Sequence, residues 1–111
     1  MADASTTIGL RMAADVTYTV EEARRLVPVV RAALLQLAVE RRRPEPSVEV
    51  VRALLEHLES LGIMVRDLDE GLIDFPTVRA GERAWLCWKM SDGDLGYWHT
   101  TREGFASRQP L

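Results

Sequence analysis

The chain has 111 residues, of which 47% are hydrophobic and 28% charged, and its formal net charge is −3. This length suits one domain, and this composition is too apolar for a chain that stays disordered. A single cysteine excludes an intramolecular disulfide, the lack of a run of about 18 apolar residues excludes a membrane span, and the scattered charges disfavour nucleic-acid binding. The sequence fits a soluble protein of the reducing cytoplasm.

The chain divides into a tail and one folded unit. Residues 1–15 are small and polar without a sustained period, so we expect a flexible tail there. The rest, 16–111, is expected to form one α+β domain, in which an antiparallel helical hairpin packs on a small antiparallel sheet of three to four strands. Its expected parts are helices over about residues 20–42 and 48–61, a sheet over about 63–100 and a C-terminal segment over 101–111.

The first helix has a clear start signal. Thr19 and Glu22 have the spacing of a capping box, and apolar residues then recur at intervals of three and four. Pro28 lies within this helix and predicts a bend near Arg24, because proline lacks an amide proton and crowds the carbonyl four residues earlier. A helix that begins only at Pro28 is the alternative.

The second helix lies between two breaks. Pro44-Glu45-Pro46 ends the first helix, Ser47 is a good N-cap, and Gly62 stops the second helix. The leucines between them follow the helical spacing, whereas His57 lies off that stripe and is expected in solvent. Each helix has one apolar stripe, so the hairpin needs a further layer, either the rest of the chain or a second copy.

Short apolar runs bounded by turn residues follow the hairpin and predict a meander of strands. Pro76 assigns the second run to an edge or a bulge, because proline cannot donate to a neighbouring strand. The third run is apolar at every position from Ala84 to Trp88, which favours a central strand. The C-terminal segment is expected to fold back over the sheet. The predicted strands are Ile63 to Arg66, Leu72 to Val78, Arg83 to Met90 and Leu95 to Thr100.

Short motifs follow one another in the C-terminal half: Gly71-Leu72-Ile73-Asp74-Phe75-Pro76, Leu86-Cys87-Trp88, Trp98-His99, Gly104-Phe105 and Arg108-Gln109-Pro110. In this order they resemble a known family, the bacterial domain-of-unknown-function family 2203. The likeness continues from Tyr18 through Arg31, so it covers most of the chain. It implies no activity, substrate or cofactor. Ser107 stands where the family leads us to expect glycine.

Six residues in or beside these motifs form the candidate ligand-binding set. Asp, His and Glu side chains can act as an acid–base pair or as three ligands of a divalent metal, and an arginine can hold a carboxylate or phosphate. These roles require the side chains to converge in space, so catalytic residues, metal and cofactor stay unassigned. The six candidates are Asp74, Trp88, Trp98, His99, Glu103 and Arg108.

Each candidate also has a structural interpretation. Asp74 can accept backbone amides at a turn, and His99 can be a half-buried strand histidine with one hydrogen bond. Arg108 is expected to tie down the C-terminal segment by pairing with Asp74 or Glu103. The tryptophans are expected in the core. Cys87 lies in an apolar strand and is expected to be an inert thiol.

Two hypotheses of function remain open. The sequence lacks the common catalytic motifs, such as a glycine-rich phosphate loop or a nucleophile elbow, which disfavours an enzyme. The first hypothesis is a non-catalytic interaction or assembly domain that forms a homodimer through the helical hairpin. The alternative is a small-ligand or metal-binding protein, possibly an enzyme, that uses Asp74, His99, Glu103 and Arg108. Nucleic-acid binding through exposed tryptophans is a remote third, because no basic groove accompanies them.

Overall fold

Two helices open the part of the chain that the computed structural model describes, residues 16–111; the expected tail over 1–15 lies outside it. Helix α2 spans Val20–Arg41 and helix α3 spans Val48–Ser60. The Thr19 capping box is confirmed: its hydroxyl accepts the Glu22 amide at 3.1 Å, and the Glu22 carboxylate accepts the Thr19 amide at 2.8 Å. Helix α2 continues through Pro28, so the later start is wrong. The bend near Arg24 stays a prediction.

The connection between the helices depends on a buried carboxylate. Glu40 is 6% exposed, and its Oε2 accepts the Ser47 amide at 2.7 Å. The Ser47 hydroxyl in turn accepts the Val50 amide at 3.2 Å and caps α3. These bonds satisfy amides at the start of α3 that have no partner within the helix. The turn therefore holds the two helices as a hairpin.

The sheet has five antiparallel strands in the order β1-β2-β3-β4-β5, so the expected number of three to four is wrong. The extra strand comes from the C-terminal segment, which folds back beside β4, and the Leu111 amide donates to the Gly96 carbonyl at 2.9 Å. Short 3-10 turns, η2 and η3, precede β4 and β5. The bounds are β1 Met64–Asp67, β2 Leu72–Arg79, β3 Glu82–Lys89, η2 Met90–Asp92, β4 Tyr97–Thr100, η3 Phe105–Ser107 and β5 Gln109–Pro110.

The placement of Pro76 corrects a second expectation. Its strand, β2, lies between β1 and β3 and is not an edge. Pairing of β1 with β2 ends at Asp74, so Pro76 lies beyond the end of β1. There its carbonyl accepts the Tyr18 amide at 2.8 Å. The N and C=O of a strand residue point to the same side, so the nitrogen of Pro76, which has no proton, also points away from β3. Pro76 therefore removes no hydrogen bond between β2 and β3.

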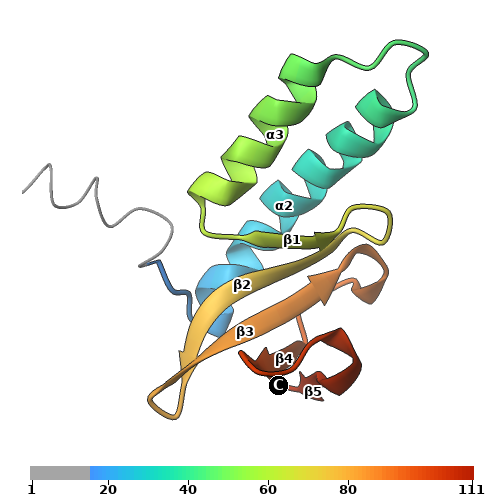
Figure 1. Cartoon of the computed structure of the whole chain (residues 1–111). Coiled ribbons are helices and arrows are strands. Elements are labelled where there is room, and N and C mark those ends of the chain that lie inside the picture. The colour runs from blue at the N-terminus through green and yellow to red at the C-terminus, as the bar shows by residue number, and fades with distance from the viewer. Residues whose placement is uncertain (1–15) are drawn as a thin grey trace, which may run out of the picture.

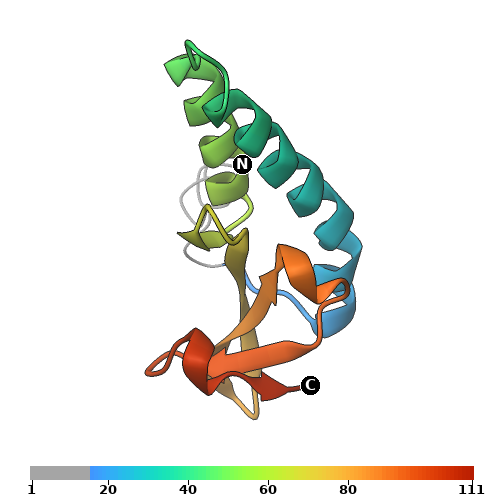
Figure 2. The same cartoon turned by 90° about the vertical axis from the view of Figure 1, so that its right-hand side faces the viewer.

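The two faces of the sheet differ in character. Alternate residues of β2 and β3, including Ile73, Phe75, Leu86 and Trp88, join the buried residues of α2 in one hydrophobic core. The intervening residues point to the opposite face, which no helix of residues 16–111 covers in Figures 1 and 2. The same views show α3 and the turn between the helices projecting beyond the sheet. Leu58 is the buried residue of α3.

The turn between β1 and β2 requires glycine at position 71. Gly71 has φ +63°, and an added Cβ would lie 2.5 Å from Cγ of Met90. Gly81 has φ +78° but no atom within 4 Å of such a Cβ, so Gly81→Ala reports backbone strain alone. We expect Gly71→Ala to lower the free energy of unfolding by about 1–3 kcal/mol more than Gly81→Ala. Urea denaturation measures both; equal losses would contradict a clash with Met90.

Candidate functional site

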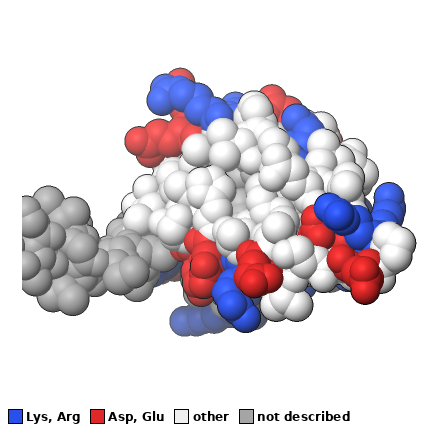
Figure 3. Space-filling model, turned by 90° about the horizontal axis from the view of Figure 1, so that it is seen from above, with Lys and Arg blue, Asp and Glu red and all other residues white. Residues whose placement is uncertain are grey.

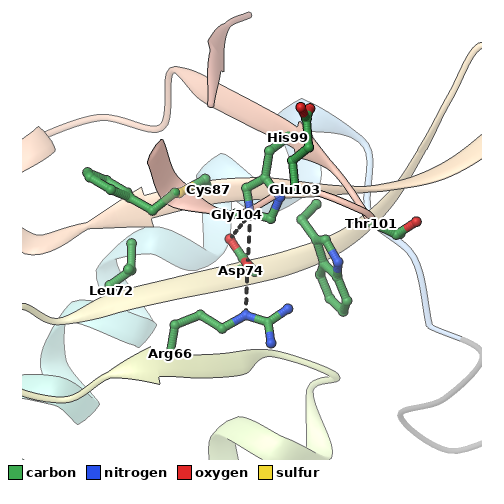
Figure 4. Close-up of a pocket in the computed structure, with 10 residues that line it drawn as sticks. Arg66, Leu72, Asp74, Cys87, His99, Thr101, Glu103 and Gly104 are labelled. Carbon is green, nitrogen blue, oxygen red and sulfur yellow. Dashed lines mark hydrogen bonds and ion pairs between the residues drawn. The ribbon is translucent and has the colours of Figure 1, made fainter. Parts of the chain in front are cut away.

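The sheet face opposite the helices contains a pocket of about 310 Å³ (Figure 4). Its floor is built from adjacent strands in register. Asp74 of β2 pairs with Cys87 of β3, and Trp85 of β3 pairs with His99 of β4. Because cross-strand partners lie side by side on one face, these four side chains are brought together by strand pairing alone.

Asp74 is the central polar group of this pocket and is only 1% exposed. Its carboxylate oxygens lie 3.0 and 3.1 Å from Nε2 of His99, and its Oδ2 accepts a hydrogen bond from Nε of Arg66 at 2.9 Å. A buried carboxylate is costly unless charged or hydrogen-bonding partners surround it. Arg66 and His99, from strands on either side of β2 and β3, provide them.

His99 is held in a fixed orientation by its second ring nitrogen. Nδ1 lies 2.8 Å from the Thr100 carbonyl, which can only accept, so Nδ1 carries a proton and donates. Nε2 faces the Asp74 carboxylate, so their contact requires a further proton shared between them. A backbone carbonyl that fixes one ring nitrogen is the usual way a metal-binding histidine is oriented. A cation bound by Nε2 and Asp74 would take the place of the shared proton.

Cys87 completes the floor of the pocket and is fully buried. Burial, reinforced by the negative charge of Asp74, raises the pKa of its thiol from 9.0 to about 11. The thiol is therefore protonated near neutral pH, which disfavours a nucleophile. A Cys-His-Asp relay is also disfavoured, because Nδ1 of His99 is committed to the backbone and Nε2 already contacts Asp74.

The three buried groups converge on one point. One ligand atom from each of Asp74, Cys87 and His99 lies within 4.8 Å of the other two. Ligands about 2.0–2.3 Å from one tetrahedral ion are separated by roughly 3.3–3.8 Å, so small shifts suffice to bind an ion. The sequence named Glu103 as the third ligand beside Asp74 and His99. In the structure Cys87 lies in that position.

Glu103 instead lies at the rim of the pocket. It is exposed, and its carboxylate accepts the Thr100 hydroxyl at 3.4 Å. In Figure 4 this carboxylate points away from Asp74. Leu72, Trp85 and Phe105 supply most of the apolar surface that lines the pocket.

Arg108 ties down the C-terminal segment, but its expected partners are wrong. Its guanidinium pairs with both carboxylate oxygens of Asp92, at 2.7 and 3.0 Å, and not with Asp74 or Glu103. It also lies over the rings of Tyr97 and Phe105, at 3.8 and 4.4 Å. Burial alone would raise the pKa of Asp92, yet the hydrogen bonds from Arg108 and from a backbone amide lower it. This partly buried pair holds the C-terminal segment that contains the pocket residue Phe105.

The two tryptophans of the candidate set do not line this pocket. Trp88 is fully buried on the helix side, where its Nε1 donates to the Gly93 carbonyl at 3.0 Å. Trp98 packs against the same core. Both therefore take the structural role that their size predicts. The tryptophan at the pocket is Trp85, whose ring lies under the Arg66 guanidinium at 4.9 Å.

The sequence did not identify Cys87 as a possible ligand, nor Arg66 as a partner of Asp74. A signal for Cys87 was present, because a two-residue turn at Ala80-Gly81 places Asp74 opposite Cys87. No comparable signal points to Arg66. Pairing of β1 with β2 shifts between Val65 and Asp67, so Arg66 is the extra residue of a bulge that aims it at Asp74.

These features define a class of protein: a helical hairpin on one face of a five-stranded antiparallel meander, with a buried carboxylate–imidazole–thiol cluster on the other. The chain belongs to the family described as "Uncharacterized conserved protein (DUF2203)", which matches residues 36–111 and so includes every residue of the pocket. The family seen in the motifs of the C-terminal half is thereby confirmed, whereas the likeness from Tyr18 through Arg31 lies outside the matched residues. Neither curated proteins nor solved structures give a match. Within residues 16–111, no helix is long and apolar enough to cross a membrane.

Cys87 is expected to react slowly with alkylating agents. A thiol pKa raised from 9.0 to about 11 reduces the thiolate fraction at pH 8 about 100-fold, and burial blocks access as well. Iodoacetamide labelling followed by mass spectrometry is expected to be at least about 100-fold slower for the folded chain than in urea. Similar rates in both conditions would contradict the buried position of this thiol.

Proposed function

We propose that this protein binds one divalent transition metal ion through Asp74, Cys87 and His99. One observation carries the proposal: three buried ligand atoms of different chemical types converge at the floor of a pocket. Two further contacts agree with a metal ion at this position. Arg66 hydrogen-bonds to Oδ2 of Asp74, which leaves Oδ1 for the ion, and Thr100 orients the His99 ring.

The mixed ligand set favours zinc or cobalt over magnesium or calcium. A thiolate and an imidazole suit borderline transition metals, whereas magnesium and calcium prefer oxygen ligands alone. The carboxylate and the thiolate together balance the charge of a divalent ion. Coordination removes the thiol proton of Cys87, as it does for any thiolate ligand.

The number of ligands favours a site with one open position. Tetrahedral zinc has four ligands, and three protein ligands leave the fourth for water or another small molecule. In this chain that position would face the pocket. Such a site binds a ligand, or activates it, whereas a site closed by four side chains serves only structure.

Metal uptake tests the proposal. We expect chelator-treated protein to bind one Co²⁺ per chain, with the near-ultraviolet absorption of a cobalt–thiolate bond. Cys87→Ser is expected to abolish that absorption and to weaken binding at least about 100-fold, because a direct ligand matters more than a group in the outer shell. A spectrophotometric titration measures both quantities.

Histidine substitutions provide the matched control. His99→Gln removes a proposed ligand, whereas His57→Gln changes an exposed histidine of α3 far from the pocket. We expect only His99→Gln to weaken Co²⁺ binding. Failure of the wild-type chain to bind cobalt, or equal binding by both variants, would contradict the proposal.

Assembly is a second candidate function, favoured by an apolar groove between α3 and β1. The groove is lined by Val48, Val51, Leu55 and Met64, and Val48 is 66% exposed. Figure 3 looks down on the hairpin and shows uncharged surface with both charge signs at its edges. Beside the groove, β1 is an open edge of the sheet.

We propose a second copy of the chain as the occupant of this groove. Its border carries both Arg52 and the carboxylates Glu56 and Glu59. A two-fold contact sets a surface against itself, so a border with both signs can pair each charge with its opposite. The same contact would cover the apolar lining.

Two exposed valines test the assembly. Val48 borders the groove, whereas Val78, 51% exposed, lies at the far end of β2. We expect sedimentation velocity at tens of micromolar to give a dimer for the wild type and for Val78→Glu, and a monomer for Val48→Glu. A monomeric wild type, or an equal effect of both substitutions, would contradict this second candidate.

A further inference from the structure

Arg66 connects the floor of the pocket with its mouth. Its Nε is bound to Asp74, and its guanidinium plane is supported by the Trp85 ring at 4.9 Å. The side chain is nevertheless 38% exposed, so its outer end is reached by solvent. A guanidinium has five N–H donors, and the bond to Asp74 takes one of them. The remaining donors lie on the partly exposed outer end of a side chain that lines the pocket.

The charges of the pocket favour a ligand with one negative charge. A divalent ion bound by the carboxylate of Asp74, the thiolate of Cys87 and the neutral ring of His99 has no net charge. Arg108 is already neutralised by Asp92. The negative charge of Asp74 is balanced by the metal ion, so it does not also balance the positive charge of Arg66. Arg66 therefore leaves one positive charge in excess at the pocket. Glu103 lies at the rim and is exposed to water, which screens its charge.

The size and the walls of the pocket limit the rest of the ligand. About 310 Å³ lies at the lower end of the roughly 300–1,000 Å³ of small-molecule sites. Leu72, Trp85 and Phe105 supply apolar and aromatic surface around the floor. The side of the ligand away from its charge therefore meets apolar walls.

We propose that the site binds a small carboxylic acid with an apolar or aromatic body, whose carboxylate bridges the metal ion and Arg66. This inference rests on the proposed metal site. A carboxylate is planar and takes two parallel hydrogen bonds from a guanidinium, which gives the geometry as well as the charge. Trp85 keeps the plane of Arg66 fixed, so its donors need little reordering when the ligand binds.

Benzoate is the probe, and benzamide is its neutral counterpart of nearly the same shape. In the cobalt-loaded protein we expect benzoate to shift the visible cobalt absorption in a saturable manner. Benzamide is expected to bind at least about tenfold more weakly, because it lacks the charge that strengthens hydrogen bonds to arginine. Acetate should also bind more weakly than benzoate, because it cannot contact the apolar walls.

Arginine substitutions complete the test. At a cobalt concentration that saturates the site of each variant, Arg66→Gln is expected to weaken benzoate binding at least about tenfold. Arg79→Gln is the control, because Arg79 stacks on Trp98 at 4.6 Å in the same manner but on the helix side of the sheet. Circular dichroism verifies that each variant is folded.

The outcomes separate the two proposals. Saturable benzoate binding that depends on Arg66 and not on Arg79 supports the carboxylate site. Cobalt uptake with equal binding of benzoate and benzamide, or with no effect of Arg66→Gln, overturns the carboxylate site and leaves the metal site standing. No cobalt uptake by the wild type overturns both.

Discussion

The buried carboxylate of Asp74 is the constraint on which the site depends. Removing such a group from water costs several kcal/mol unless opposite charges and hydrogen bonds replace the lost hydration. Here Arg66 and His99 replace it, and they come from β1 and β4, on the two outer sides of the central pair of strands. The polar cluster can therefore be satisfied only when four strands are assembled in the correct register. A slip of one residue would turn Asp74 into the hydrophobic core.

Stability and chemistry are divided between the two faces of the sheet. The helix side contains the apolar core, and its polar groups connect α2 with the sheet and its loops. Arg31, for example, donates to the Gly93 carbonyl at 2.9 Å and lies over the Trp88 ring. The open side contains the pocket and the buried cluster of Asp74, Cys87 and His99. The C-terminal segment, clamped through Arg108 and Asp92, supplies the pocket wall on that side. The core can hold the sheet in place while the open face keeps an arrangement suited to binding.

Much of the fold followed from local signals, because each of them depends on residues close in sequence. The capping box at Thr19, the N-cap at Ser47 and the turn-bounded strand runs are of this kind. The fifth strand was missed because two residues have no period to detect. The missing amide of Pro76 is visible in the sequence and predicts an edge or a bulge, whereas the end of β1 beside Pro76 is not visible there.

The candidate site was only half predictable for the same reason. Asp74 and His99 stood out as polar residues within apolar motifs, and the structure brings them together. Cys87 could have been placed from the two-residue turn at Ala80-Gly81, whose residues both have positive φ as in a tight hairpin. Arg66 depends on a bulge and Arg108 on the path of a loop. Neither is set by a local pattern.

X-ray absorption spectroscopy of the zinc-loaded protein tests the central claim most directly, because it identifies the atoms bound to the metal. We expect one sulfur at about 2.3 Å and two or three nitrogen or oxygen atoms at about 2.0–2.1 Å from the zinc ion. Cys87 is the one cysteine of the chain, so that sulfur would identify its source. A shell of oxygen and nitrogen atoms without sulfur would contradict a metal centre at Asp74, Cys87 and His99.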